Sequence, residues 1–328
     1  MPGYSDIIGH EQIKEHLMNA IAADKVNHAY ILNGPEGSGK RMLADAFAMA
    51  LQCERGGKEP CLECRSCRQA MNGNQPDIIY VTHEKPRTIS VDDIRNMNHS
   101  VQIKPYSSKY KVFVVDEAEK MNVQAQNALL KTIEEPPAYA VILLLTTKAD
   151  AFLPTILSRS IRLDLKPVSD SVMREHLMKN YGIPDYEADA CVAFAQGNVG
   201  KAIALAGSKD FAALKSSVVD LVKRIDNTDL YELESTAEQM MEYKLEISDY
   251  FDLMRVWYRD VLYHKTTNDV NGLVFKEEVL EIKRQAAKHS YQGLEQILEA
   301  LDRARIRCEA NVSQKLVLEL LLMTLKEN

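Results

Sequence analysis

The sequence predicts an α/β domain with a parallel sheet, followed by a small helical lid and an all-helical C-terminal domain. Three observations support this fold class. Short apolar segments alternate with helical patterns in the first half of the chain, a glycine-rich loop follows the first segment directly, and the strand pattern stops beyond about Pro167. Strands that alternate with helices are typical of a parallel sheet with helices on both faces.

Four apolar segments are predicted to form the sheet, at residues 29–32, 78–81, 112–115 and 141–145. Helical patterns lie at residues 11–23, 42–51, 91–97 and 123–133. The pattern over 42–51 is apolar nearly all round, as expected of a helix buried against a sheet. From about Ser208 only helices are expected, with long stretches at 231–263, 277–289 and 292–308. The predicted domains are residues 1–166, 167–207 and 208–328.

The glycine-rich loop reads Gly34-Pro-Glu-Gly37-Ser-Gly39-Lys40-Arg41 and matches a phosphate-binding loop at every position but the last. Its glycines let backbone N–H groups turn inward around phosphate oxygens, and the lysine reaches the outer phosphates. A serine or threonine normally follows the lysine, and its hydroxyl ligates the Mg²⁺ that bridges the terminal phosphates. Arg41 stands in that place and cannot ligate a cation. The sequence therefore predicts a nucleotide-binding architecture that has lost a magnesium ligand.

Two polar pairs end strands beside this loop. Asp116 and Glu117 follow the segment at 112–115, where carboxylates can hold Mg²⁺ and orient the attacking water. Thr146, which precedes Thr147 at the end of the next strand, is predicted to offer its hydroxyl to the γ-phosphate. The alternatives are a strand-terminating polar pair and an ordinary turn pair.

Length and charge restrict the class of protein. A chain of 328 residues indicates about two or three domains. A net charge of -7 argues against wrapping of nucleic acid through overall basicity, although it leaves room for a local basic patch. No apolar run approaches the ~18–20 residues needed to span a bilayer, and the N-terminus lacks the regions of a signal peptide. We therefore expect a cytoplasmic protein.

Four of the six cysteines lie close together and are predicted to bind a metal: Cys53, Cys61, Cys64 and Cys67. In a reducing cytosol such a cluster is more often a metal site than a set of disulfides. Four thiolates fill the tetrahedral shell of Zn²⁺ and leave no open position, so the predicted zinc is structural. An iron–sulfur cluster is the alternative. The cysteine–proline run of ferredoxins is absent from the sequence, which favours zinc.

Several longer motifs point to one family. Residues 111–137 join the third strand, its acidic end and the next helix, and residues 153–160 read Leu-Pro-Thr-Ile-Leu-Ser-Arg-Ser. Three further parts of the sequence belong to the same family pattern: residues 8–10, residues 28–30 and the cysteine insertion. With these motifs in this order, the chain resembles the bacterial clamp-loader family of AAA+ proteins. The similarity is dense over residues 4–165. It continues more weakly to residues 310–312 and 316–319, which resemble the family's helical collar.

The departures from the family pattern concern ATP hydrolysis. Arg41 replaces the hydroxyl that holds magnesium. The motor subunits carry a Gly-Ser-x-Arg-Asp-Ala motif in the lid, and residues 197–202 place Gly200 at the position of its arginine, beside Lys201. The chain also ends after the collar, whereas the long motor form has further domains. The resemblance thus implies a non-motor, stator-like subunit with little or no ATPase activity. The alternatives are an active ATP-hydrolysing motor subunit and a module that holds ATP or ADP without turnover.

The resemblance also implies a role for Arg159, in the sequence Ser158-Arg159-Ser160. It corresponds to the arginine finger of the family's Ser-Arg-Cys motif, which acts in trans on ATP bound to a neighbouring subunit. The implied function is to help load a sliding clamp onto primed DNA for the DNA polymerase III holoenzyme, a nucleotidyltransferase. The implied partners are the motor (tau/gamma) and delta subunits, the sliding clamp, and primer–template DNA reached through the complex at the replisome.

Overall fold

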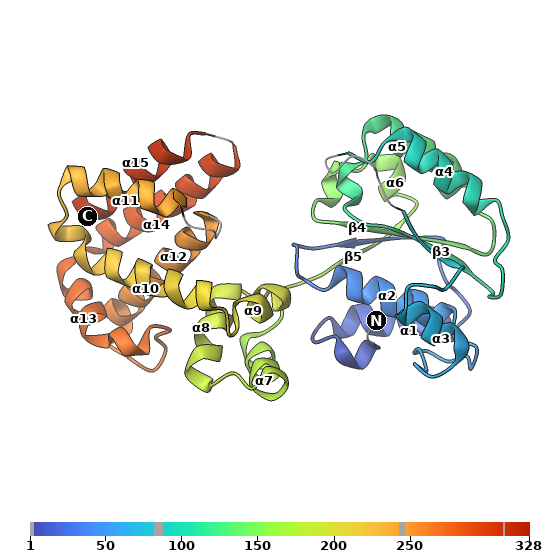
Figure 1. The fold of residues 1–328 in the computed structure, drawn as a ribbon, viewed down its shortest axis with the longest axis horizontal. Coiled ribbons are helices and arrows are strands. Elements are labelled where there is room, and N and C mark those ends of the chain that lie inside the picture. The colour runs from blue at the N-terminus through green and yellow to red at the C-terminus, as the bar shows by residue number, and fades with distance from the viewer. Residues whose placement is uncertain (1–2, 82–87, 243–246, 311) are drawn as a thin grey trace. The chain divides into compact units, whose positions relative to one another are not determined.

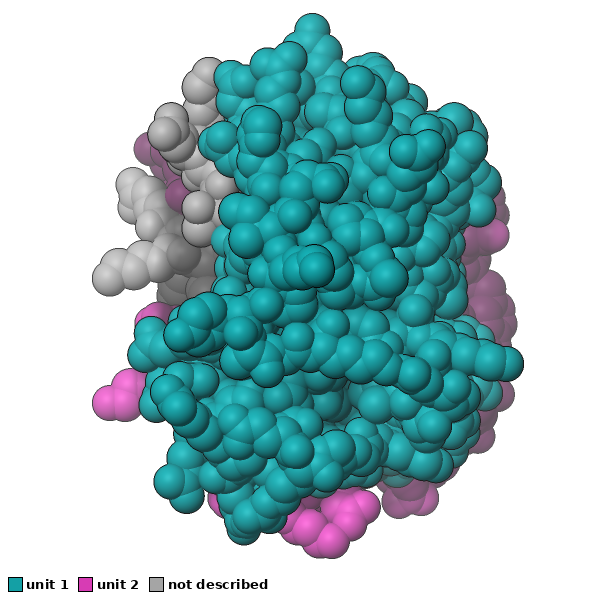
Figure 2. All heavy atoms as spheres, turned by 90° about the vertical axis from the view of Figure 1, so that its right-hand side faces the viewer, with its two compact units in different colours: residues 1–173, 197–201 teal, residues 174–196, 202–328 magenta. Residues whose placement is uncertain are grey.

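The computed structural model describes residues 3–81, 88–242, 247–310 and 312–328 (Figure 1). The chain forms two compact units, shown in two colours in Figure 2. Unit 1 consists of residues 1–173 and 197–201, and unit 2 consists of residues 174–196 and 202–328. The division into three domains at residues 166 and 207 stays a prediction.

Unit 1 is built on a five-stranded parallel sheet. Its strands are β1 (Ala29–Asn33), β2 (Ile78–Val81), β3 (Lys111–Val115), β4 (Ala140–Thr146) and β5 (Ile161–Asp164). Their order is β2-β3-β4-β1-β5, and each neighbouring pair is parallel. The four predicted strands are confirmed, whereas β5 was not predicted. Because β4 lies between β1 and β3, the carboxyl ends of these three strands are adjacent.

Helices cover both faces of the sheet (Figure 1). One face carries α1 (Glu11–Ala22), α2 (Lys40–Leu51) and α3 (Arg65–Met71), and the other carries α4 (Val91–Val101), α5 (Val123–Glu134) and α6 (Pro154–Leu157). Alternate residues of β1 pack into the two cores. Tyr30 packs against Phe47 of α2 with ring centroids 5.3 Å apart, whereas Ile31 joins the core under α4 and α5. The apolar pattern of residues 42–51 is explained by burial of α2 from Leu43 to Leu51.

Unit 2 is helical. The remaining helices are α7 (Asp170–Tyr181), α8 (Asp185–Ala195), α9 (Val199–Leu205), α10 (Lys209–Arg224), α11 (Leu230–Glu242), α12 (Ile247–Thr267), α13 (Val279–Lys288), α14 (Tyr291–Glu309) and α15 (Gln314–Glu327). The first residues of α7 and α9 belong to unit 1. The helices predicted at 277–289 and 292–308 correspond to α13 and α14. The helix predicted at 231–263 corresponds to α11 and α12, and residues 243–246 between them lie outside the described residues. Residue 311 of the collar motif lies outside them too.

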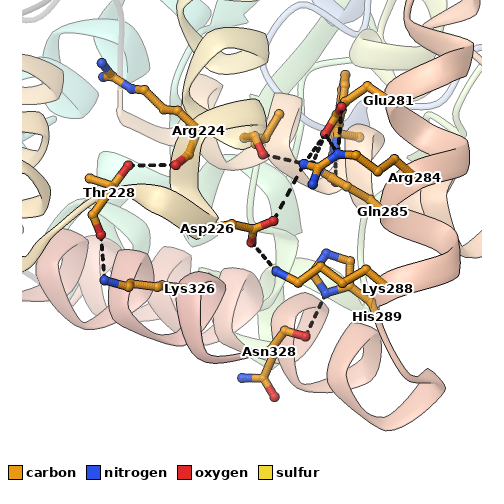
Figure 3. A network of polar contacts seen from close by, with 12 residues as sticks. Arg224, Asp226, Thr228, Glu281, Arg284, Gln285, Lys288, His289, Lys326 and Asn328 are labelled. Atoms are coloured by element: carbon orange, nitrogen blue, oxygen red, sulfur yellow. Dashed lines mark hydrogen bonds and ion pairs between the residues drawn. The ribbon is translucent and has the colours of Figure 1, made fainter.

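A polar network fixes the packing of α13 in unit 2 (Figure 3). The side chain of Gln285 is buried, accepts a hydrogen bond from the indole N–H of Trp257 at 2.8 Å, and donates to the carbonyl of Val222 at 2.8 Å. At the end of the same helix, Lys288 pairs with Asp226 at 2.7 Å. A buried amide whose donor and acceptor are both satisfied specifies how neighbouring helices meet. These bonds therefore set α13 against α10 and α12.

The helices in the described parts of the chain include none that is long and apolar enough to cross a membrane.

Candidate nucleotide site and cysteine cluster

A cavity of about 580 Å³ lies at the carboxyl ends of β1, β3 and β4. Seven of the eight residues predicted for the nucleotide site line it: Gly37, Gly39, Lys40, Arg41, Asp116, Glu117 and Thr146. The eighth, Gly34, begins the loop, and its N–H donates to the carbonyl of Thr146 at 3.1 Å. The structure thus brings the predicted residues to one place, while their roles stay predictions.

The loop between β1 and α2 requires its glycines. Gly37 and Gly39 have φ angles of +75° and +95°, in the left-handed region where other residues are strained. At Gly34 a Cβ atom would lie 2.9 Å from both Ser38 Oγ and Leu165 Cβ. Gly39 is the N-cap of α2 and offers no side chain to cap it. The first N–H groups of α2 and its dipole therefore favour an anion at this end of the cavity.

Lys40 reaches back over the loop from the first position of α2. Its ammonium donates to the carbonyls of Gly34 and Pro35, at 2.6 and 2.9 Å. Burial lowers the pKa of Lys40, and the nearby carboxylates of Glu119 and Asp116 oppose that shift. An ammonium has three N–H donors, so one remains for a ligand oxygen.

Arg41 is held by carboxylates on two elements. Its Nε donates to Asp45 of α2 at 3.1 Å, and its NH1 donates to Asp116, directly after β3, at 3.1 Å. The ring of Tyr80 lies 4.1 Å from the guanidinium carbon, and the Tyr80 hydroxyl donates to Asp45 at 2.9 Å. Burial acts to lower the pKa of Arg41, but the carboxylates of Asp45 and Asp116 outweigh it and raise that pKa. The guanidinium thus stays charged, and the partly buried Asp45 and the ring of Tyr80 hold it beside Asp116.

The other polar residues at the strand ends contact one another. Glu117 pairs with Lys120 at 2.7 Å, and the hydroxyl of Thr147 donates to Glu119 at 2.6 Å. Thr146 is buried, and its hydroxyl accepts a hydrogen bond from the N–H of Lys148 at 3.0 Å. Thr147 therefore presents its hydroxyl on the surface of the strand end, whereas that of Thr146 caps the turn after β4.

The segment at 197–201 contacts the tip of the phosphate loop. The N–H of Gly200 donates to the carbonyl of Gly37 at 2.9 Å, and the side-chain amide of Asn198 donates to the carbonyl of Glu36 at 2.6 Å. A Cβ atom at Gly200 would lie 2.7 Å from the carbonyl oxygen of Gly37 and 2.8 Å from its Cα. The loop tip thus occupies the space that an arginine at position 200 would need for its first carbon atom.

Several contacting residues were not predicted from the sequence: Glu36, Asp45, Tyr80, Glu119 and Asn198. Asp45 could have been found, because an acidic residue four positions after an arginine forms an i,i+4 pair on a helix. Glu119 lies three residues after Asp116 and could have been included with the acidic strand end. Tyr80 contacts Arg41 only through the tertiary fold, and the sequence carries no local sign of that contact. Asn198 lies in the segment aligned with the lid motif, but its contact with Glu36 was not predicted.

The four predicted cysteines form one cluster after α2. Their sulfur atoms all lie within 4.8 Å of one another, and the sulfurs of Cys61 and Cys67 are 3.9 Å apart. Tetrahedral thiolates at about 2.3 Å from Zn²⁺ would stand ~3.8 Å from one another. The backbone N–H of Cys64 donates to the sulfur of Cys61, and that of Cys67 donates to Cys64, each at 3.3 Å. The donor set therefore fits one tetrahedral metal ion.

The protonation of the thiols also suits a metal site. Hydrogen bonds from the backbone N–H groups of Cys64 and Glu63 lower the pKa of Cys61 to about 6. Burial raises the pKa of Cys53 and of Cys67. Buried neighbouring thiols lose their protons readily when a cation compensates their charge. A bound cation is thus the partner that this arrangement of sulfurs favours.

Arg159 lies outside the cavity. It follows α6, its NH1 donates to the carbonyl of Thr155 at 3.0 Å, and its NH2 lies 3.3 Å from the carboxylate of Glu134. About 41% of its side chain is exposed, as is 46% of that of Glu134. An ion pair this exposed is weak, so little free energy holds Arg159 in this position. Its guanidinium is accessible to a partner.

The relatives of the chain are subunits of DNA polymerase III. The family described as "DNA polymerase III, delta subunit" matches residues 9–169. The delta' subunit of Bacillus subtilis is 26% identical over 319 residues, which cover 96% of each chain. The tau subunit of the same organism is 27% identical over 324 residues, which cover 92% of this chain and 57% of tau.

Other relatives match over shorter stretches or in fold. The tau/gamma subunit of Haemophilus influenzae is 34% identical over 209 residues, which cover 62% of this chain and 30% of that protein. A solved structure of a gamma subunit-related protein from Thermotoga maritima covers 97% of this chain and 98% of its own, at 21% identity and a TM-score of 0.44. The family match covers the phosphate loop and the acidic strand end, since it spans residues 9–169. The similarity to delta' extends over the full length of the chain. These similarities support a place for the chain among the clamp-loader AAA+ proteins.

Proposed function

We propose that this chain is a delta-prime-type, stator-like subunit of a DNA polymerase III clamp loader, which acts in the cytosol with motor and delta subunits to place a sliding clamp on primed DNA. The observation that carries the non-motor part of this proposal is the contact between Arg41 and Asp116 at 3.1 Å. In a metal-dependent site this carboxylate serves the magnesium ion. In this chain the guanidinium of Arg41 donates a hydrogen bond to Asp116 instead.

The lid segment supports the same proposal. Motor subunits of the family place an arginine where Gly200 stands, and the backbone of Gly37 fills the space beside Gly200. Loss of a cationic contact to the transition state typically lowers the rate by orders of magnitude. Two groups that bring positive charge to the phosphates are absent from the described site: the hydroxyl that ligates magnesium and the lid arginine.

ATP turnover by the purified chain tests this proposal against the second candidate, an active motor subunit. The motor reading is favoured by the acidic strand end at Asp116 and Glu117 and by the similarity to tau. We expect the wild-type chain to release phosphate no faster than a Lys40→Ala variant, because neither would position magnesium on the terminal phosphates. Turnover well above that control, and dependent on Mg²⁺, would establish the motor reading.

Substitution of Gly200 by arginine is expected to destabilise the chain without restoring hydrolysis. The new Cβ would meet the backbone of Gly37 at 2.7 Å, and overpacking of this kind typically costs about 1–3 kcal/mol. Urea unfolding and phosphate release would measure the two effects. Lys201→Arg is the control, because it keeps a long cation next to this position and Lys201 already has a Cβ. Unchanged stability of Gly200→Arg together with a gain in ATPase activity would contradict the contact described here.

Nucleotide held without turnover is a further part of the proposal. Beside the loop, a second cavity of about 350 Å³ is lined by residues that include Gly9, His10 and Val168, and His10 donates to the carbonyl of Ser38 at 3.0 Å. We infer that the phosphates of ATP or ADP bind at Lys40 and that the base lies towards His10. In this proposal the loop binds a nucleotide that supports the structure and is not hydrolysed.

The cysteine cluster is proposed to hold a structural zinc ion. Cys53, Cys61, Cys64 and Cys67 supply four thiolates and leave no position for a reacting water. The ion would tie the segment between α2 and α3 to the rest of unit 1.

The helices of unit 2 are proposed to act as a collar that binds neighbouring subunits. On α15 the side chains of Leu316, Leu320 and Met323 are exposed to 51%, 45% and 39%. Residues spaced by four and three positions share one face of a helix. An apolar face of this kind suits the interface between subunits of a hetero-oligomer.

A further inference from the structure

We propose that Arg41 replaces the magnesium ion at this site, and that the cavity binds a nucleoside diphosphate without a divalent cation. This inference rests on the part of the proposed function in which nucleotide is held without turnover. It further specifies that the nucleotide is a diphosphate, that Arg41 compensates the charge of its phosphates, and that binding needs no metal.

The position of the guanidinium supports the replacement. Arg41 belongs to the first turn of α2, at the position whose hydroxyl would ligate magnesium, and it reaches the carboxylate of Asp116 after β3. A magnesium ion would have to lie between the same two elements. Asp45 and the ring of Tyr80 hold the guanidinium from other sides. A positive charge is therefore already fixed where the ion would bind, and it repels a second cation.

The cations at the cavity still have N–H groups available for phosphate. A guanidinium has five N–H donors, and two of those of Arg41 bond to Asp45 and Asp116. The ammonium of Lys40 bonds to two carbonyls and has one further proton. The start of α2, which has no side-chain cap, adds backbone N–H groups. Together these donors form a cradle for the oxygens of two linked phosphates.

The charges of the cavity favour a diphosphate over a triphosphate. Four carboxylates line it, those of Glu36, Asp116, Glu117 and Glu119, whereas Lys40 and Arg41 are its cationic residues among those that the structure describes. A third phosphate would extend towards the acidic strand end. There the hydroxyl of Thr147 already donates to Glu119. Without a divalent cation, the repulsion from these carboxylates increases with each phosphate charge.

The first test compares the binding of fluorescently labelled ADP to the purified chain in EDTA and in excess Mg²⁺. We expect the two dissociation constants to differ by less than about twofold, because no metal takes part. Labelled ATP should bind more weakly than ADP in EDTA. Lys40→Ala should lose binding in both buffers. Arg95→Thr on α4 is the matched control for removal of an exposed, ion-paired arginine, and it should leave both constants unchanged.

Two substitutions distinguish the guanidinium from a metal. Arg41→Thr removes the cation and restores the hydroxyl, so binding in EDTA should weaken at least about tenfold and Mg²⁺ should recover it. Asp116→Asn keeps the shape of the side chain and releases Arg41 from one carboxylate, so binding in EDTA should tighten. If Asp116 instead served a metal, the same substitution would weaken binding in Mg²⁺. If Arg41→Thr fails to fold, the Asp116→Asn variant still tests the inference.

Three results would overturn the inference: binding of ADP by the wild-type chain that requires Mg²⁺ by tenfold or more, equal binding in EDTA by wild type and Arg41→Thr, or weakened Mg²⁺-ADP binding by Asp116→Asn. The first would leave the proposed nucleotide holding intact. Absence of binding in both buffers would remove the nucleotide from the proposal altogether. The role that the family resemblance implies for Arg159 is measured separately in the assembled loader, and none of these results affects it.

Discussion

We propose that Arg159 is an arginine finger, so an Arg159→Ala variant assembled with the proposed motor and delta subunits is expected to lower ATP hydrolysis at the neighbouring site by about a thousandfold or more, the size typical of a finger supplied in trans. The side chain is accessible, and the exposed pair with Glu134 at 3.3 Å gives it up at little cost. The measurement is DNA-stimulated ATPase activity and clamp loading by the reconstituted complex. Binding of ATP to the complex should change much less than its turnover.

Arg162→Ala is the matched control for this prediction. Arg162 lies on β5, three residues beyond Arg159, its side chain is also 41% exposed, and it is paired with Asp150 and Asp164. Its loss removes the same charge from the same region of unit 1. If the two variants had equal activity, or if Arg159→Ala left turnover unchanged, Arg159 would be an ordinary surface residue.

Removal of the proposed zinc ion from the cysteine cluster is expected to cause the largest loss of stability. A Cys64→Ser variant loses one of four thiolates and the cap of α3, because the sulfur of Cys64 accepts from the N–H of Cys67. Structural zinc sites contribute several kcal/mol to folding, so we expect a fall of about 10 °C in the melting temperature. Cys308→Ser, on α14 and outside the cluster, should change it little. Thermal unfolding followed by circular dichroism would measure both variants.

Elemental analysis of the native protein completes this test. We expect one zinc ion per chain, and its release by a thiol-modifying reagent should be accompanied by the same loss of stability. Iron in place of zinc would establish the iron–sulfur alternative. A protein of full stability without any metal would show that the sulfurs act only through packing.

The sequence predicted the central part of the fold because the pattern there is local. The strands that became β1, β2, β3 and β4 are apolar runs, and burial on both faces requires such runs. The edge strand β5 reads Ile161-Arg-Leu-Asp164, with alternate residues exposed, and four residues of alternation are too few to distinguish from a loop. Helix α3 has only seven residues, begins at the end of the cysteine insertion and has no apolar period of its own.

The site was predictable as far as its motifs are contiguous. The loop, the acidic strand end and the four cysteines could be identified because phosphate and metal chemistry impose fixed spacings on them. The contacts of Arg41 with Tyr80 and Asp116 could not, since these residues reach it from β2 and from the end of β3. The sequence showed that position 200 lacks an arginine, but the backbone contact with Gly37 that leaves no space for one emerged only from the structure.

The backbone contact between Gly37 and Gly200 limits which substitutions the site tolerates. A mutation that reintroduced a long side chain at position 200 would push the loop tip away before it could help any reaction, because the carbonyl of Gly37 lies where the Cβ atom would go. A mutation that restored a hydroxyl at position 41 would leave Asp45 and Asp116 without their cation. Each of these substitutions alone therefore removes an existing contact. Recovery of both groups would require compensating changes at the loop tip and at Asp45.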